Sequence, residues 1–131
     1  MGLDLVKNNY AFWEFIRCLR NMEAVRQGFI EQKEIYPEQH ERFMKSYSDC
    51  FYICLVDKEP AGYVGVIDDD IRVAVHPDFQ GKGVGTFMVN GLMEMHETAY
   101  AKIKLENTAS IKLFEKCNFT KRYYIMEKNE A

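Results

Sequence analysis

The stretch IRVAVHPDFQGKGVGTFMV, residues 71–89, decides the fold class of this 131-residue chain. Its first five residues are mostly apolar and predict a strand, and the glycine-rich run QGKGVG, residues 80–85, then leads into an apolar helix. Glycine lets the backbone approach a ligand closely, and the first amides of a helix have no partner within it. Together they predict a cradle of N–H donors suited to a pyrophosphate, to which Lys82 adds positive charge.

Other interpretations of this loop require a different spacing or no ligand at all. A Rossmann fingerprint needs GxGxxG at the opening of a unit of parallel strands, whereas this run reads GxGxG. A Walker A loop needs Gly-Lys followed by Ser or Thr, and here Gly83 follows Lys82. A glycine-rich turn without a ligand satisfies the pattern too, so the glycine spacing by itself leaves that alternative open.

The residues before this loop predict an antiparallel meander of three strands. Apolar runs at residues 51–56, 61–67 and 71–75 are separated by the turn-forming runs DKEP and DDD. Further upstream, we predict a short strand at residues 3–6 and helical segments at residues 9–20, 25–30 and from Pro37 to about residue 47.

The residues after the loop alternate between helix and strand. The helix that starts near Val84 carries a stripe of large apolar side chains. Residues 101–105 alternate Lys with apolar residues, as a half-buried strand does, and Asn107 is a suitable N-cap for a helix that runs to about Cys117. Residues 119–126 predict a last strand, so the whole pattern indicates a mixed sheet with helices packed on it.

Composition excludes several classes of protein. A length of 131 residues indicates one domain spanning residues 1–131, and 14% aromatic content argues against disorder. The formal charge of −3, with scattered basic residues, argues against nucleic acid as a partner. The sequence lacks an apolar run long enough for a membrane span or a secretory signal, so we expect a cytoplasmic protein. Its four cysteines have no metal-ligand spacing, and we expect free thiols and no bound metal.

Two blocks of this sequence resemble the signature of GNAT acetyltransferases. VHP at residues 75–77, followed by QGKGVG at residues 80–85, is similar to the coenzyme A block V-x-P, then Q/R-x-x-G-x-G/A. NTASIKLFEKCNF at residues 107–119 resembles the second block, N-x-x-(A/S)-x-x-L-(Y/F)-x-x-x-G-F. The resemblance covers residues 51–119 well and is looser before them. It implies the α+β GNAT acyl-CoA N-acyltransferase fold, with a mixed central sheet, an antiparallel N-terminal meander and helices on both faces.

The resemblance implies that acetyl-CoA is the co-substrate and assigns residues to it. The outer end of the strand at residues 73–75 would bind the pantetheine arm, and the amide near Val75 would polarise the thioester carbonyl. The amides of residues 80–85 would hold the pyrophosphate, and Asn107 and Ser110 would line the far side of the arm. The residues that the resemblance assigns to the coenzyme are Val73, Val75, Gln80, Gly81, Lys82, Gly83, Val84, Gly85, Thr86, Asn107, Ser110 and Phe114.

The sequence departs from the family pattern at three places. Asn118 stands where the family has glycine, and Asn tolerates the left-handed conformation expected after the helix. Phe114 stands where many members carry a tyrosine that acts as general acid, so the thiolate proton would come from water, Tyr123 or Tyr124. The tail has room for about one strand where the family usually has two. The edge of the predicted sheet is then either covered by a partner subunit or left without its last strand. We therefore expect a homodimer or a monomer.

The expected reaction is direct attack of an amine on the thioester in a ternary complex. No Cys/His/acid constellation in the sequence suggests an acyl-enzyme. The general base is open: Asp69 lies near the strand start where some family members carry a carboxylate, but aspartate is also a common turn residue. His40, on the apolar stripe of the second helix, is the other candidate, although a lone core histidine is commoner than a catalytic one.

The acceptor amine is expected to bind near the N-terminal helices. RNMEAVR at residues 20–26, followed by His40, is similar to the region of GNAT enzymes that acetylate protein N-termini or nucleotide-linked amino sugars. We therefore predict that Arg20, Asn21, Arg26 and His40 bind the substrate, although these residues also fit a solvated helix end. A nucleotide-linked amino sugar is the favoured acceptor. A protein N-terminus or lysine, or a coenzyme A-binding module without catalysis, are the alternatives.

Overall fold

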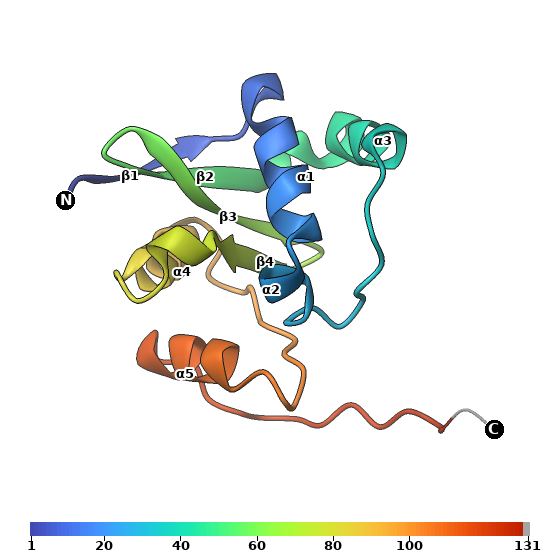
Figure 1. Cartoon of the computed structure of the whole chain (residues 1–131). Coiled ribbons are helices and arrows are strands. Elements are labelled where there is room, and N and C mark those ends of the chain that lie inside the picture. The colour runs from blue at the N-terminus through green and yellow to red at the C-terminus, as the bar shows by residue number, and fades with distance from the viewer. Residues whose placement is uncertain (130–131) are drawn as a thin grey trace.

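A four-stranded antiparallel sheet in the order β1-β2-β3-β4 forms the centre of the computed structural model, which describes residues 1–129 (Figure 1). The three strands predicted as a meander form β2, β3 and β4, and β1 pairs with the outer side of β2. No helix of residues 1–129 combines the length and the apolar character that crossing a membrane requires. The elements are β1 (Leu3–Lys7), α1 (Trp13–Asn21), α2 (Glu23–Arg26), α3 (Pro37–Tyr47), β2 (Phe51–Val56), β3 (Glu59–Ile67), β4 (Asp70–Val75), α4 (Val84–Met95) and α5 (Thr108–Lys116).

The two hairpin turns of the meander have the backbone conformation that a two-residue connection favours. Asp57 and Lys58 have φ values of 48° and 74°, and Asp68 and Asp69 have values of 51° and 64°. Two consecutive left-handed residues match the right-handed twist of the flanking strands, and Asp tolerates this conformation better than most residues. The predicted turns are therefore confirmed, and they fix the register that places β4 at the open edge of the sheet.

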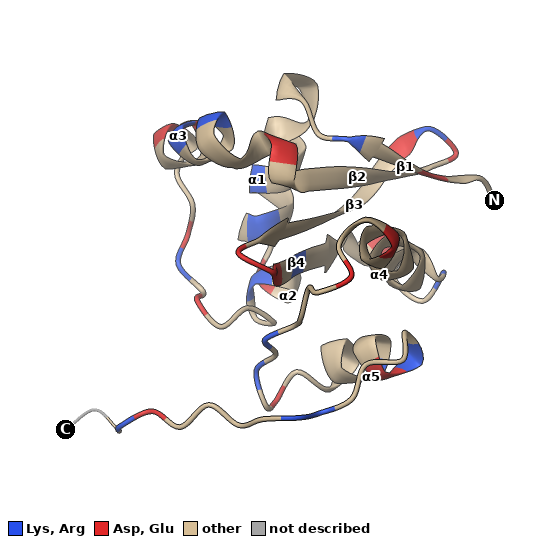
Figure 2. Ribbon diagram, turned by 180° about the vertical axis from the view of Figure 1, so that it is seen from behind, with Lys and Arg blue, Asp and Glu red and all other residues tan. Residues whose placement is uncertain are grey.

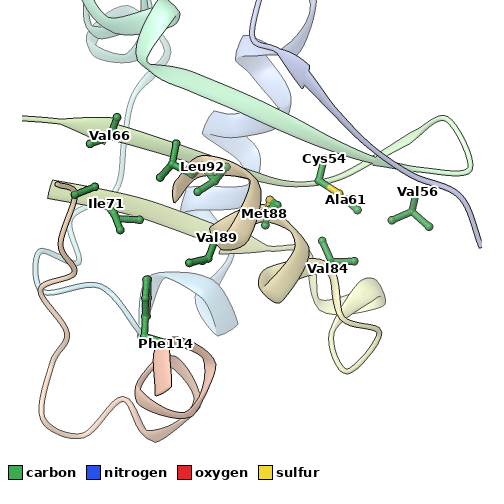
Figure 3. Packing of buried hydrophobic residues seen from close by; sticks show 12 residues of the cluster. Cys54, Val56, Ala61, Val66, Ile71, Val84, Met88, Val89, Leu92 and Phe114 are labelled. Carbon is green, nitrogen blue, oxygen red and sulfur yellow. The ribbon is translucent and has the colours of Figure 1, made fainter. Parts of the chain in front are cut away.

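Helices cover both faces of the sheet, as the predicted fold class requires. On one face, α4 packs Val84, Met88, Val89 and Leu92 against the strands, and Phe114 of α5 points toward α4 (Figure 3). On the other face, α1 and α3 cover a second cluster that contains Ile16, Leu19 and Met44. Period-2 alternation along the strands supplies one set of side chains to each cluster. The predicted α+β class, with helices on both faces of the sheet, is confirmed.

Two predicted strands do not form. Beyond the single parallel bridge between Asp70 and Tyr100, residues 101–105 have no strand pairing. Residues 119–126 run along the outside of the molecule, where Tyr123 and Met126 are 91% and 89% exposed (Figure 1). Both segments have the apolar pattern of strands, but a strand also needs a neighbouring strand for its backbone hydrogen bonds. The prediction of a mixed sheet is therefore wrong for the described residues, in which the only parallel pairing is the bridge between Asp70 and Tyr100.

The ends of the helices differ from the prediction by small amounts. Residues 10–12 form a 3-10 turn before α1, and the helical segment expected at 25–30 is the short α2. Asn107 is the N-cap of α5, with its Oδ1 accepting a hydrogen bond from the Ser110 amide at 3.1 Å, as predicted. Asn118 has a φ of 70°, so it takes the left-handed position expected of the missing glycine.

Candidate functional site

A cleft of ≈ 800 Å³ opens beside the outer edge of β4. One wall is the loop at residues 79–86 and the start of α4, and the opposite wall is α5 with residues 101–103. The end of α1 and the loop at residues 28–31 line the remaining side. Because residues 101–105 do not pair with β4, the cleft lies at the edge of the sheet where a fifth strand would pair.

The glycine-rich loop has the geometry of an anion cradle. Gly81 and Gly83 have φ values of 75° and 80°, and a Cβ built on either would meet no heavy atom within 4 Å. Gly83 is the N-cap of the 12-residue helix α4, and its carbonyl accepts the hydrogen bond of Phe87 at 3.0 Å. The amides that precede Phe87 in the first turn have no intrahelical acceptor, so they are available to a ligand. Open space above left-handed glycines at a helix N-terminus fits a pyrophosphate group.

The outer edge of β4 offers further backbone groups to the cleft. The amide of Ile71 donates outward to the Tyr100 carbonyl at 2.9 Å, whereas the amide of His76 donates to Ala61 of β3 at 2.7 Å. Since these directions alternate along a strand, Val73 and Val75 direct their amides outward into the cleft. The Gln80 side chain donates to the Val75 carbonyl at 3.4 Å, which links the strand to the glycine loop.

Asn107 connects two walls of the cleft, α5 and the loop that follows α2. Besides capping α5, its Nδ2 donates to the Gly28 carbonyl at 3.0 Å. A Cβ on Gly28 would lie 2.9 Å from that same Nδ2, so the loop approaches as closely as a glycine permits. Lys104 reinforces the connection because its Nζ donates to the Gln27 carbonyl at 3.0 Å. The loop that follows α2 is thereby held against the wall made by α5.

The structure brings nearly all residues predicted to bind the coenzyme to one cleft. The exception is Lys82, whose Nζ lies 5.6 Å from the centroid of the Phe79 ring. Phe114 is buried and packs edge-on against Phe119, so the position of the usual tyrosine has become part of the core. The predicted residues that line the cleft are Val73, Val75, Gln80, Gly81, Gly83, Val84, Gly85, Thr86, Asn107, Ser110 and Phe114.

Of the predicted substrate residues, Arg20 alone lies among those that line the cleft. The Asn21 side chain bonds both the amide and the carbonyl of Ile35, each at 2.8 Å, so it holds the loop before α3. Arg26 lies at the end of α2, outside the cleft lining. Arg20 and Asn21 lie at the end of α1 and Arg26 lies at the end of α2. The chain changes direction between these helices, so the three side chains do not face the same site.

The predicted bases lie outside the cleft lining. His40 is buried on α3, where its Nε2 bonds the Trp13 carbonyl at 2.8 Å, and burial lowers its pKa. Its Nδ1 is also buried, with no partner among the described residues. Asp69 is exposed in the turn between β3 and β4, where its Oδ1 accepts a hydrogen bond from Thr98 at 3.2 Å. The carboxylates in the cleft lining belong to Asp70 and Glu31.

The cleft contains two residues that the sequence did not single out, Tyr63 of β3 and Arg72 of β4. The Nε of Arg72 lies 3.7 Å from Oδ2 of Asp70. Arg72 interrupts the otherwise apolar run IRVAV, and this charge inside a strand is the signal that could have identified it. Tyr63 gave no such signal, because an aromatic residue in a strand is ordinary core material.

None of the four cysteines is placed to act as the nucleophile of an acyl-enzyme. Cys18, Cys50, Cys54 and Cys117 all lie outside the cleft lining. Burial raises the pKa of the Cys54 thiol to about 11, which disfavours the thiolate. Within residues 1–129, no three His, Cys, Asp or Glu side chains gather as a group that would hold a metal ion.

Comparison with known proteins gives a family and several structural relatives. Residues 13–119 match the sequence profile of the acetyltransferase (GNAT) family. An uncharacterised N-acetyltransferase of Methanocaldococcus jannaschii is 25% identical over 96 residues, which cover 60% of this chain and 42% of that protein. The chain therefore spans about two fifths of the length of this curated relative.

Two solved structures have closely similar folds. The spermidine N-acetyltransferase from Vibrio cholerae, in complex with CoA and spermine, superposes with a TM-score of 0.81 at 20% identity. The match covers 96% of this chain and 85% of that one. A domain from Methanocaldococcus jannaschii superposes with a TM-score of 0.82 at 22% identity, covering 92% of this chain and 90% of that domain. At these identities the likeness establishes the fold.

Proposed function

This chain belongs to the acetyltransferase (GNAT) family, the family of acetyl-CoA-dependent N-acetyltransferases, and from that premise we propose its reaction and its acceptor. The reaction is transfer of an acetyl group from acetyl-CoA directly to a primary amine in a ternary complex. The acceptor is a small molecule, with a nucleotide-linked amino sugar favoured. The single observation that carries the reaction is the cradle at Gly81 and Gly83, which opens onto the same cleft as the free edge of β4.

The protein groups in the cleft suit this chemistry. Acetyl-CoA supplies an activated thioester when it is bound. The amides from Gln80 to Gly85 hold the pyrophosphate, and the outward amides of Val73 and Val75 hold the pantetheine arm. The Val75 amide also donates to the carbonyl oxygen on which negative charge develops, and a fixed donor there lowers the barrier. Asn107 and Ser110 line the opposite side of the arm.

Positioning supplies much of the acceleration in this proposal. Holding the amine in line with the thioester replaces a bimolecular encounter by a reaction within one complex. The position of the thiols outside the cleft lining supports direct attack by the amine. Asp69 and His40 remain predictions for the general base. Asp70, the carboxylate of β4 in the cleft lining, is a competing candidate whose position favours it.

Charge in the cleft supports a nucleotide-linked acceptor over a polycationic one. The basic residues of the lining are Arg20, Arg72, Lys102, Lys112 and Lys116, against Glu31 and Asp70 as the acidic residues. Spermine, which the Vibrio cholerae relative is described as binding, carries only positive charges and would require carboxylates. A sugar nucleotide carries a diphosphate, which arginine binds well.

Turnover of acetyl-CoA against a panel of amines tests the reaction. Thiol release is measured with an amino sugar linked to uridine diphosphate, with spermidine and with a peptide that has a free N-terminus. We expect thiol release and a mass increase of one acetyl group on the sugar nucleotide. Acetylated peptide or spermidine without acetylated sugar nucleotide would replace the favoured acceptor, and binding of coenzyme A without any turnover would indicate a non-catalytic module.

Calorimetric titration with coenzyme A tests the site itself. Wild-type protein is compared with Gly81→Val, in which the side chain would occupy the open space above the loop. We expect binding by the wild type and a large loss in the variant. A wild-type protein with no measurable affinity for coenzyme A would end the proposal.

A further inference from the structure

Three side chains from different elements converge at the acceptor end of the cleft. Arg20 lies in the last turn of α1, Tyr63 lies in β3, and Arg72 lies in β4. Tyr63 pairs across the sheet with Ala74, so those two side chains share a face, and Arg72 is two residues from Ala74 on the same strand. This is the face that α1 covers. Figure 2 shows basic positions on α1 beside β3 and β4.

Aromatic contacts hold Arg20 in position. Its Cζ lies 5.7 Å from the centroid of the Phe43 ring, a cation–π geometry. Phe43 contacts Phe51 edge-on at 6.1 Å between ring centroids, and Phe51 contacts Tyr63 in the same way at 5.8 Å. The guanidinium is therefore placed by a row of rings that leads to Tyr63. It has no carboxylate within ion-pair distance among the described residues.

The Tyr63 hydroxyl is a neutral donor between two positive charges. Tyr63 is 2% exposed, and burial raises the pKa of its hydroxyl to about 12, while the charges of Arg20 and Arg72 act in the opposite direction. Arg72 lies diagonally across the strand pair from Tyr63 on the same face of the sheet, and the row of rings leads from Tyr63 to Arg20. No hydrogen bond joins this hydroxyl to another described residue, and Tyr63 lines the cleft, so the hydroxyl is available to a ligand.

The acidic residues of the cleft do not neutralise this site. Asp70 is the nearer candidate, but at 3.7 Å from Nε it engages one edge of the Arg72 guanidinium and leaves the other donors free. Glu31 belongs to the loop at residues 28–31, and its carboxylate lies 3.8 Å from Nζ of Lys33. Two guanidinium groups and a hydroxyl donor therefore line the cleft with one carboxylate beside them.

We propose that Arg20, Arg72 and the Tyr63 hydroxyl bind an anionic group, a phosphate or a carboxylate, carried by the amine acceptor. The site rests on the proposed function for the reaction that the acceptor then undergoes. It lies on the face of the sheet covered by α1, whereas the coenzyme cradle lies at the loop before α4. An anion held there fixes the acceptor at one end and leaves its amine free to approach the thioester beside Val75.

Binding of an anion to protein that is already saturated with coenzyme A tests the site independently of catalysis. Uridine diphosphate is titrated by calorimetry into the wild type and into Arg20→Gln, Arg72→Gln and Tyr63→Phe. Arg42→Gln is the matched control, because Arg42 is exposed on α3 and lies outside the cleft lining. A charge-assisted hydrogen bond corresponds to roughly 10- to 100-fold in affinity, so we expect each arginine variant to raise Kd by at least about tenfold.

The remaining arms identify the anion and check the fold. Arg20→Lys keeps the charge without the planar fork and should recover part of the affinity. Glutarate in place of uridine diphosphate distinguishes a carboxylate site from a phosphate site. Unchanged affinity for coenzyme A in each variant shows that the fold is intact.

Two results would overturn the inference: no binding of either anion by the coenzyme-saturated wild type, or equal affinity in the wild type and both arginine variants. Either result leaves the proposed reaction standing, provided that acetyl-CoA is turned over with an uncharged amine.

Discussion

In the function and the anion site that we propose, the two sides of the cleft bind their ligands with different parts of the chain. The coenzyme side uses backbone amides from one continuous segment, the end of β4 and the loop into α4. The acceptor side uses the side chains of Arg20, Tyr63 and Arg72, which come from three separate elements. A loop that presents backbone amides to a ligand needs glycines before a helix N-terminus, so a site of this kind leaves a pattern in the sequence. A site built from side chains of three separate elements can be recognised only when the fold is known.

The strongest way to break the coenzyme side alone is Gly83→Val. A β-branched residue at a φ of 80° is strained, and its methyl groups would enter the open space above the loop. Loss of two charge-assisted hydrogen bonds predicts a rise in the coenzyme A Kd of about 100-fold, measured by calorimetry. Gly2→Ala is the control, since Gly2 has ordinary space for a Cβ. An unchanged Kd in Gly83→Val would mean that the phosphates bind elsewhere.

Asn107→Ala should affect both sides, because this side chain caps α5 and also bonds Gly28. Loss of the cap and of the bond to the loop predicts a fall of about 1–3 kcal/mol in the free energy of unfolding. Hydrogen exchange should also become faster at residues 27–31. The matched control is Ser110→Ala, which keeps the Ser110 amide that Asn107 bonds. If both variants unfold alike, Asn107 does not connect the two walls.

Phe43→Leu should weaken the acceptor side alone, and by less. Leucine keeps most of the apolar volume but removes the ring face that Arg20 contacts. A cation–π contact of about 0.5–1 kcal/mol predicts a two- to fivefold fall in kcat/KM for an anionic acceptor. The affinity for coenzyme A should not change. A fall of equal size with an uncharged amine would show that the ring acts by packing and not through Arg20.

The pH dependence of stability tests the role of His40, and here we expect the smallest effect. Burial lowers the pKa of His40, so the folded protein binds this proton more weakly than the unfolded chain does. The stabilisation is therefore complete above the unfolded pKa of about 6.5 and is lost as the pH falls below it. His40→Gln should remove this part of the pH dependence, measured by urea unfolding between pH 7.5 and 5. Equal pH dependence in both proteins would place the His40 ring in contact with water.

The fold was largely predictable because its signals are local. The meander was readable from apolar runs separated by turns, and Asn107 and Asn118 were readable as cap residues. The failures concern residues 101–105 and 119–126, whose apolar patterns suit strands. Pairing depends on whether an edge is available in space, and no single segment encodes that.

The lining of the cleft was largely predictable on the coenzyme side, whereas on the acceptor side only Arg20 was predicted. The glycine loop has a pattern of its own in the sequence, but Tyr63 could be recognised only once α1 was seen to cover its face of the sheet. Asp69 and His40 were proposed from the positions of their residue types. Asp69 lies in an exposed turn and His40 lies in the core. The residue type alone does not reveal whether a side chain faces the cleft, the solvent or the core.

The exposed tail has a consequence for how the protein behaves at high concentration. The run YYIM at residues 123–126 is a short apolar segment of high strand propensity that is left open to water. Such runs associate with one another unless charges flank them. Lys121 and Arg122 precede this run, and Glu127 and Lys128 follow it. We expect these four charged side chains to oppose contact between separate copies, so that neutralising them would promote aggregation.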